Sequence, residues 1–312
     1  MKMRNVFAAA SAGLALMLLA ACSGQESTPM PAQAAAPATG IQYHFVTNKL
    51  MIPTTREQAQ AFALNVDGVS QEHPKNIFGE LFALLTSAAQ GVELQATLDQ
   101  AVDTGQVVSL HMVKADDPLN DTSVSWSIYL GQKSESAPKF DGSDIFTLDT
   151  ATPTNSPIVG SLTNGHFSGG PGAARVQMFI MGQLVDVGLI GVRLEADLSA
   201  QGCADGKLGG GVTVDEFNGK LLPAIAAGIN QVTKTDAAAA NAILQAFDTD
   251  EDGTITIQEL EDNTLLMIAI SPDLDLLDAS GAFNPGQDGE KDSYSVGMGF
   301  TCVPASFDAP GD

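Results

Sequence analysis

The sequence predicts an α+β fold: an antiparallel β-sandwich or barrel-like core, a helical region before it, and a helical segment inserted between its strands. Runs of alternating apolar and polar residues are typical of strands with one buried face. The segments that join these runs are rich in Gly, Pro, Ser, Thr and Asn, as in antiparallel connections. Two further stretches carry apolar residues at helical spacing instead.

The N-terminal residues predict export. Lys2 and Arg4 precede an apolar run from residue 6 to 21, which has the proportions of a secretory signal and is too short for a stable membrane span. The run ends in Leu19-Ala20-Ala21-Cys22, which resembles the lipobox of bacterial lipoproteins. The resemblance implies that residues 1–21 are removed and that Cys22 is acylated. An ordinary signal peptide containing a cysteine is the alternative.

Residues 22–40 are expected to form a flexible tether, because their Pro, Ala and Ser cannot bury a core. The residue after the cysteine is Ser23 and not an Asp. By the same resemblance, this favours transfer of the protein to the outer membrane over retention at the inner membrane. Residues 41–312 then form one large α+β domain. In this interpretation the lipid on Cys22 is the only membrane anchor.

The first patterned stretch of the domain, residues 76–104, is predicted to be helical. Asn76 is a candidate N-cap, and Gly91 and Gly105 are candidate stops. Two apolar stripes occupy the stretch between them: Ile77, Leu81, Leu84 and Leu85, then Leu94, Leu98 and Val102.

The β core is expected in residues 106–200 and 293–303. Its clearest alternating runs are Val124, Trp126, Ile128 and Leu130; Ile190, Val192, Leu194, Ala196 and Leu198; and Tyr294, Val296, Met298, Phe300 and Cys302. His111 lies on the face opposite Leu110, so we expect it to be half-exposed. Residues 165–170 predict a glycine-rich turn, since His166 occupies the place of the Gly that a nucleophile elbow needs before Ser168.

Helices are predicted to return in residues 213–270. Thr213 and Glu216 have the spacing of a capping box, and Pro223 should kink the helix that follows because its ring removes a hydrogen bond.

Within this segment, residues 248–259 read Asp-Thr-Asp-Glu-Asp-Gly-Thr-Ile-Thr-Ile-Gln-Glu. Calcium prefers six to eight oxygen ligands, and alternate Asp residues in a tight loop can supply them. The glycine allows a sharp turn with positive φ. The spacing resembles the EF-hand calcium loop, and the resemblance implies as ligands Asp248, Asp250, Asp252, the Thr254 carbonyl and both oxygens of Glu259, with Thr256 acting through a water.

The EF-hand resemblance extends to the residues that flank the loop. The resemblance implies an entering helix whose apolar face includes Ala240, Ile243, Leu244 and Phe247. It also implies that Ile255 anchors the loop in a short strand pairing. Leu260 fits an exiting helix, but Asn263 and Thr264 occupy apolar positions, which predicts a short or rotated one. An acidic turn without metal is the alternative.

EF-hands usually occur in pairs, and a second good loop is absent from the sequence. Three other acidic stretches are interpreted as surface loops: Asn65 to Gly68; Asp273, Asp275 and Asp278; and Asp288 to Asp292. The histidines have no spacing typical of zinc ligands.

Composition restricts the partners. The mature chain has 12 basic against 37 acidic residues, a net charge of −25, which argues against binding nucleic acid or anionic lipid head groups by charge. With Cys22 acylated, Cys203 and Cys302 remain for a disulfide in an oxidising compartment. Two free thiols are the alternative.

The sequence therefore predicts a non-enzymatic, lipid-anchored envelope protein that binds one calcium ion in a structural rather than sensor role. A hydrolase whose calcium only supports a loop near its active site is the alternative, and paired carboxylates in a cleft would favour it. The order of features is also similar to that of bacterial envelope lipoproteins with acidic calcium-type loops, a resemblance that implies no activity.

Overall fold

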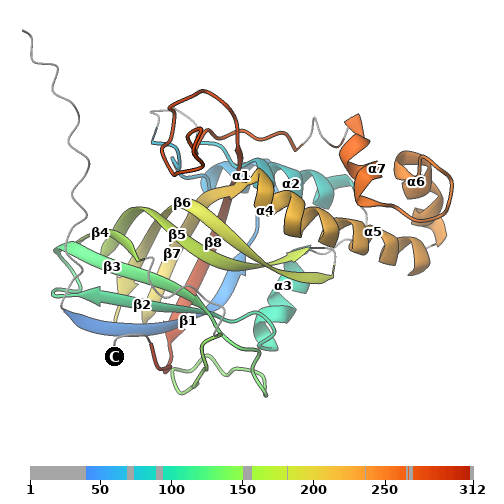
Figure 1. The fold of residues 1–312 in the computed structure, drawn as a ribbon. Coiled ribbons are helices and arrows are strands. Elements are labelled where there is room, and N and C mark those ends of the chain that lie inside the picture. The colour runs from blue at the N-terminus through green and yellow to red at the C-terminus, as the bar shows by residue number, and fades with distance from the viewer. Residues whose placement is uncertain are drawn as a thin grey trace, which may run out of the picture. The chain divides into compact units, whose positions relative to one another are not determined.

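Eight antiparallel strands close into a barrel in the computed structural model, each strand pairing with its neighbours in sequence and β8 closing on β1 (Figure 1). The structure describes residues 40–68, 74–88, 94–149, 157–180, 182–235, 237–264, 266 and 270–309. The strands are β1 (Ile41–Met51), β2 (Ser109–Ala115), β3 (Asp121–Leu130), β4 (Ile158–Thr163), β5 (His166–Ile180), β6 (Gln183–Ser199), β7 (Gly202–Thr213) and β8 (Ser293–Pro304). Of the two predicted architectures, the barrel is therefore correct.

Two strands and one turn differ from the expectation. The pattern did not predict β1 or the glycine-rich β7. The predicted turn at residues 165–170 is wrong beyond Gly165, because β5 begins at His166 and Ser168 pairs with Ser161 and Glu195 on the neighbouring strands.

The barrel interior is filled by the alternating side chains of the strands, and the largest of them are aromatic. Trp126 and Phe167 are fully buried, and their ring centroids lie 5.1 Å apart. Phe300 reaches the same layer, 6.4 Å from Trp126. Of the hollows found among the described residues, the two inside this core have volumes of only about 20 Å³ each, so the barrel has a packed centre.

His111 lies in this interior, and its predicted half-exposed position is wrong: only 2% of the residue is accessible. The Trp126 indole N–H donates to His111 Nδ1 at 3.1 Å, which leaves Nε2 to donate to Thr47 Oγ1 at 2.7 Å. Burial lowers the pKa of His111 to about 3, because the cation would lose its hydration. The histidine is therefore a neutral core residue whose two ring nitrogens are both hydrogen-bonded.

The helices come from the two predicted regions, apart from the short α1. Before the barrel's second strand lie α1 (Arg56–Ala61), α2 (Ile77–Ala88) and α3 (Leu94–Asp103). Between β7 and β8 lie α4 (Val214–Glu216), the π turn η1 (Phe217–Leu221), α5 (Leu222–Thr235), α6 (Ala237–Phe247) and α7 (Ile257–Asp262). The π turn stands directly before Pro223, where the sequence predicted a kink.

Asn76 is the N-cap of α2, as predicted, and it also attaches the helix to the barrel. Its Oδ1 accepts from the N–H groups of Gly79 and Gly297 at 2.9 Å each. Its Nδ2 donates to the carbonyls of Ala59 and Gly297 at 3.0 Å each. One buried carboxamide thereby connects α1, α2 and β8.

The predicted disulfide is confirmed. Cys203 and Cys302 stand opposite each other on β7 and β8, with Cα atoms 4.8 Å apart, and are bonded. The predicted signal, lipobox and tether lie outside the described residues. Within the described part of the chain, no helix combines the length and the apolar character needed to cross a membrane.

Candidate metal centre

The acidic loop is held between two helices that are anchored in the core. On α6, Ile243, Leu244 and Phe247 pack against the main hydrophobic cluster, as the spacing predicted. On α7, Leu260 is fully buried. Figure 1 places α6 and the loop that follows it near the end of α5 that is far from α4, with α7 beside α5, and residues 249–254 of the loop are exposed. The loop is therefore exposed, and its two ends are fixed.

Three of the predicted ligand side chains converge. Asp248, Asp250 and Asp252 each offer one carboxylate oxygen, and these three oxygens lie within 4.8 Å of one another. Among the described residues, no other group of three or more His, Cys, Asp or Glu side chains could hold a metal. Like charges this close repel one another, and a divalent cation between them would offset the repulsion.

The backbone of the loop is wound around its own carboxylates. Asp248 accepts from the N–H groups of Asp252 at 3.2 Å and Gly253 at 2.8 Å, one on each oxygen. Asp252 in turn accepts from the Thr254 N–H at 2.7 Å. Gly253 has a φ of +83°, the conformation that the sequence predicted for it, and Glu251 has a φ of +60°. These hydrogen bonds and the two residues with positive φ give the first half of the loop a tight winding.

Glu259 does not join the three aspartates; its carboxylate accepts four hydrogen bonds from two threonines. Oε1 accepts from the Thr249 N–H at 2.6 Å and hydroxyl at 3.1 Å. Oε2 accepts from the Thr256 N–H at 2.8 Å and hydroxyl at 2.9 Å. Thr256 is also the N-cap of α7, so the pair forms a capping box. Glu259 therefore connects the first and last parts of the loop.

The Glu259 contacts predict a specific response to acid. The N–H groups of Thr256 and then Thr249 stabilise the ionised form and lower the pKa of Glu259 to about 2, against an ordinary value of 4.5. A carboxylate with a lowered pKa stabilises the fold fully above about pH 4.5, and that contribution is lost as the pH falls toward 2.

We therefore expect the urea midpoint of wild type, measured in chelator, to fall more steeply between pH 4.5 and 2 than that of Glu259→Gln. The difference between the two curves isolates Glu259 from the other carboxylates. Parallel curves would contradict the assignment.

Ile255 is fixed by a contact that differs from the predicted strand pairing. Its side chain is 1% exposed, as an anchor should be. In the described part of the chain, however, the loop pairs with no strand: Asn230 on α5 donates to the Ile255 carbonyl at 2.7 Å and accepts from its N–H at 2.8 Å. Asn263, which ends α7, donates to the Ala246 carbonyl at 2.9 Å and thus connects α7 to α6.

The acidic stretch between α7 and β8 is not the solvated cluster that we expected. Asp275 is 4% exposed and accepts from the Gly289 N–H at 2.7 Å. Asp273 accepts from the Ser295 N–H and hydroxyl, and burial raises its pKa. Asp292 accepts from the N–H groups of two residues on the facing segment. These carboxylates order the segment by binding its backbone.

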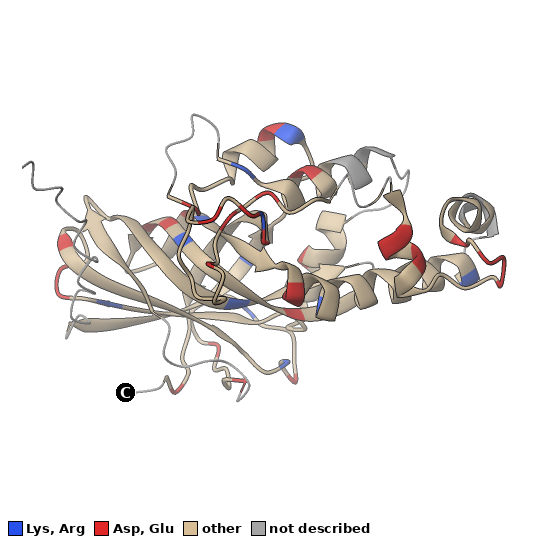
Figure 2. Ribbon diagram, turned by 45° about the horizontal axis from the view of Figure 1, so that its top comes forward, with Lys and Arg blue, Asp and Glu red and all other residues tan. Residues whose placement is uncertain are grey.

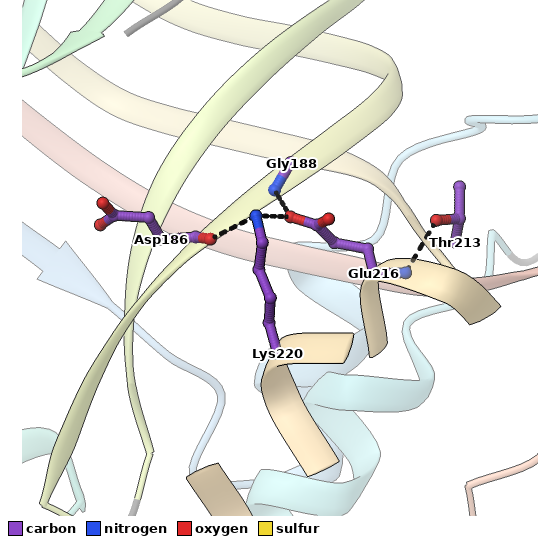
Figure 3. Close-up of polar contacts among 5 residues, drawn as sticks. All are labelled: Asp186, Gly188, Thr213, Glu216 and Lys220. Atoms are coloured by element: carbon purple, nitrogen blue, oxygen red, sulfur yellow. Dashed lines mark hydrogen bonds and ion pairs between the residues drawn. The ribbon is translucent and has the colours of Figure 1, made fainter. Parts of the chain in front are cut away.

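A hollow of about 260 Å³ lies over β3, β5 and β6, and Glu216 is the carboxylate in its described lining. That carboxylate is engaged: it accepts from the Gly188 N–H at 2.7 Å and pairs with Lys220, which also donates to the Asp186 carbonyl (Figure 3). The two side chains thus cover the edge of β6 where β7 ends. The predicted mutual capping box is half correct, because Thr213 accepts from the Glu216 N–H while the Glu216 carboxylate binds β6.

Candidates for acid–base chemistry remain few in the described residues. His166 Nδ1 lies 2.7 Å from Asp197 Oδ1, and both side chains are about half exposed. Acidic residues are dispersed over many loops, the α6–α7 loop among them, and Lys and Arg are sparse between them (Figure 2).

The sequence did not predict the roles of Asn230 and Thr249, because these roles depend on tertiary contacts. The available signal for Asn230 was a polar residue directly after Ile229 in an apolar helical stripe.

Comparison with family models, with curated proteins and with solved structures finds no match to this chain. The assignment of a function therefore depends on the geometry of the acidic loop and on the sequence motifs.

Proposed function

We propose that this protein binds one calcium ion in the loop Asp248–Glu259 and that the ion has a structural role. The observation that carries the proposal is the convergence of Asp248, Asp250 and Asp252, whose oxygens lie within 4.8 Å of one another in a loop wound at Gly253. The twelve-residue spacing adds the Thr254 carbonyl as a further oxygen ligand. Glu259 would complete the site by exchanging its hydrogen bonds to Thr249 and Thr256 for the ion.

The chemistry of these ligands favours calcium. All of the candidate ligands are oxygens, which suits hard cations and not the thiolate and imidazole sites of zinc. Calcium accepts six to eight ligands in flexible geometry, whereas magnesium requires a near-ideal octahedron at shorter distances. An exposed loop that offers several carboxylates, a carbonyl and a water matches the flexible coordination of calcium better than the strict octahedron of magnesium.

The surroundings of the loop support a structural role. A sensor opens its helices to expose an apolar groove. Here the apolar faces of α6 and α7 pack into the core that they share with the barrel, and Asn263 connects α7 to α6. The ion would hold together helices that already have a fixed position.

We further propose that the protein is anchored in the cell envelope by a lipid on Cys22, in the outer membrane, with calcium as its ionic partner. The lipobox resemblance and the Pro- and Ala-rich tether support this location. The Cys203–Cys302 disulfide agrees with an oxidising compartment. Extracellular calcium sites often bind at about 10⁻⁴–10⁻³ M, so calcium outside the cytoplasm would fill this one.

The test is a pair of melting curves in calcium and in chelator. A ligand at 100 times its Kd stabilises the folded state by about 2.7 kcal/mol, which for a domain of this size is a rise in Tm of roughly 5 °C. We expect this rise in wild type, a smaller one in magnesium, and little in Glu259→Gln, which keeps the shape of the side chain and loses its charge. Equal melting temperatures of wild type in calcium and in chelator would refute the proposal.

A further inference from the structure

The second half of the acidic loop is held by a single side chain from another helix. Asn230 Oδ1 accepts from the Ile255 N–H at 2.8 Å, and Asn230 Nδ2 donates to the Ile255 carbonyl at 2.7 Å. A carboxamide presents a donor and an acceptor side by side, as a peptide group does. Asn230 therefore gives Ile255 the same two hydrogen bonds that a neighbouring strand would give.

Asn230 can hold the loop because its own position is fixed. It lies on α5, where Leu222, Ala226 and Ile229 are buried in the main core. The Ile255 side chain lies in the same core. The backbone and the side chain of Ile255 are thus both attached to the barrel assembly, while the carboxylates of Asp250 and Asp252 remain exposed.

The two halves of the loop consequently have different restraints. Ile255 lies between Thr254, whose carbonyl is a proposed ligand, and Thr256, whose N–H and hydroxyl bind Glu259. A shift of Ile255 would move both neighbours. On the other side of the loop, the three converging aspartates repel one another, and a cation between them would offset that repulsion.

We propose that Asn230 is a positioning residue for the calcium site: its carboxamide replaces a partner strand, sets the affinity of the loop for calcium, and connects occupancy of the loop to α5. This inference rests on the proposed calcium binding. Because coupling between two interactions is reciprocal, a clamp that favours the calcium-bound loop must itself be strengthened by calcium.

The test compares Asn230→Leu with Gln231→Leu, an exposed neighbour on the same helix, in the full chain. Asn230→Leu keeps the size of the side chain and loses both hydrogen bonds. We expect its Kd for calcium, measured by titration calorimetry, to weaken about tenfold, while the Kd of Gln231→Leu stays within twofold of wild type. We also expect the Tm of Asn230→Leu to fall more in calcium than in chelator.

A purely structural role gives a different result: Asn230→Leu melts lower by the same amount in calcium and in chelator, and its Kd is unchanged. That outcome would overturn the inference and leave calcium binding intact. Failure of wild type to bind calcium would overturn both proposals.

A measurement on wild type alone covers the case in which Asn230→Leu does not fold. Hydrogen exchange at the Ile255 amide should slow when calcium is added, and an unchanged rate would refute the coupling.

Discussion

Replacing Cys203 and Cys302 with serine is expected to lower the free energy of unfolding by about 4 kcal/mol. The bridge spans 99 residues, and in the chain-entropy model a closed loop of about 100 residues restricts the unfolded chain by up to 4.7 kcal/mol. In the folded state the two positions stay opposite each other on β7 and β8, so the native barrel should persist. We expect Tm to fall by roughly 7 °C.

The reductant supplies the control for this prediction. Urea unfolding of wild type in excess dithiothreitol should coincide with unfolding of the double serine variant, and the variant should not respond to dithiothreitol. The calcium loop lies inside the span of the bridge, yet its ligands are local. Calcium should therefore raise the Tm of the variant as much as that of wild type. A wild-type midpoint that does not respond to the reductant would contradict the expected contribution of the disulfide.

The sequence predicted strands well where one face of a strand packs in the barrel and the pattern is unbroken. Trp126 and Ile128 on β3, and Leu194 and Ala196 on β6, are buried as the alternation indicated. The choice between sandwich and barrel could not be made in this way, because alternation fixes the face of a residue and not the neighbour of its strand. Closure depends on β1 pairing with β8, far apart in sequence.

There are physical reasons why the sequence pattern did not predict β1 and β7. β7 carries three consecutive glycines, Gly209 to Gly211, which are typical of turns. In the fold they allow close packing: a Cβ on Gly211 would lie 2.3 Å from the Leu276 side chain. β1 has a shift in register between Thr47 and Lys49, and such a bulge breaks the period of two.

His111 shows why alternation alone cannot identify the solvent side of a strand. Leu110 and Met112, on the other face of β2, are buried under Phe146 and Phe307 on the outside of the barrel. Both faces of β2 are therefore covered. The segments that cover the outer face lie elsewhere in the chain, and nothing in the β2 sequence indicates them.

In the candidate site, too, some features could be predicted from the local sequence and others needed the structure. The convergence of the three aspartates and the positive φ of Gly253 follow from twelve consecutive residues, so local spacing predicted them. The contact between Asn230 and Ile255 joins residues 25 positions apart and needed the structure. Spacing predicted Glu259 as a ligand with both oxygens, and only the structure gives its hydrogen bonds to Thr249 and Thr256.

Asp250→Asn is expected to have opposite effects with and without calcium. Asn keeps one oxygen that can bind calcium and loses the negative charge, so the substitution should weaken the calcium Kd about tenfold. In chelator the same change removes one of three repelling charges, and Asn keeps the oxygen that accepts from the Asp252 N–H at 3.2 Å. The calcium-free variant should therefore melt at or slightly above the wild-type temperature.

Glu251→Gln is the matched control, because it removes the same charge one residue away, from a side chain outside the converging group. If the loop is only a solvated acidic turn, the two variants should behave alike in calorimetry and in melting. If the three aspartates surround an ion, Asp250→Asn should lose about half of the calcium-dependent rise in Tm at 100 times the wild-type Kd, and Glu251→Gln should retain all of it. The comparison thus separates a metal site from a general effect of charge: both variants change the net charge equally, and only one of them changes a carboxylate of the converging group.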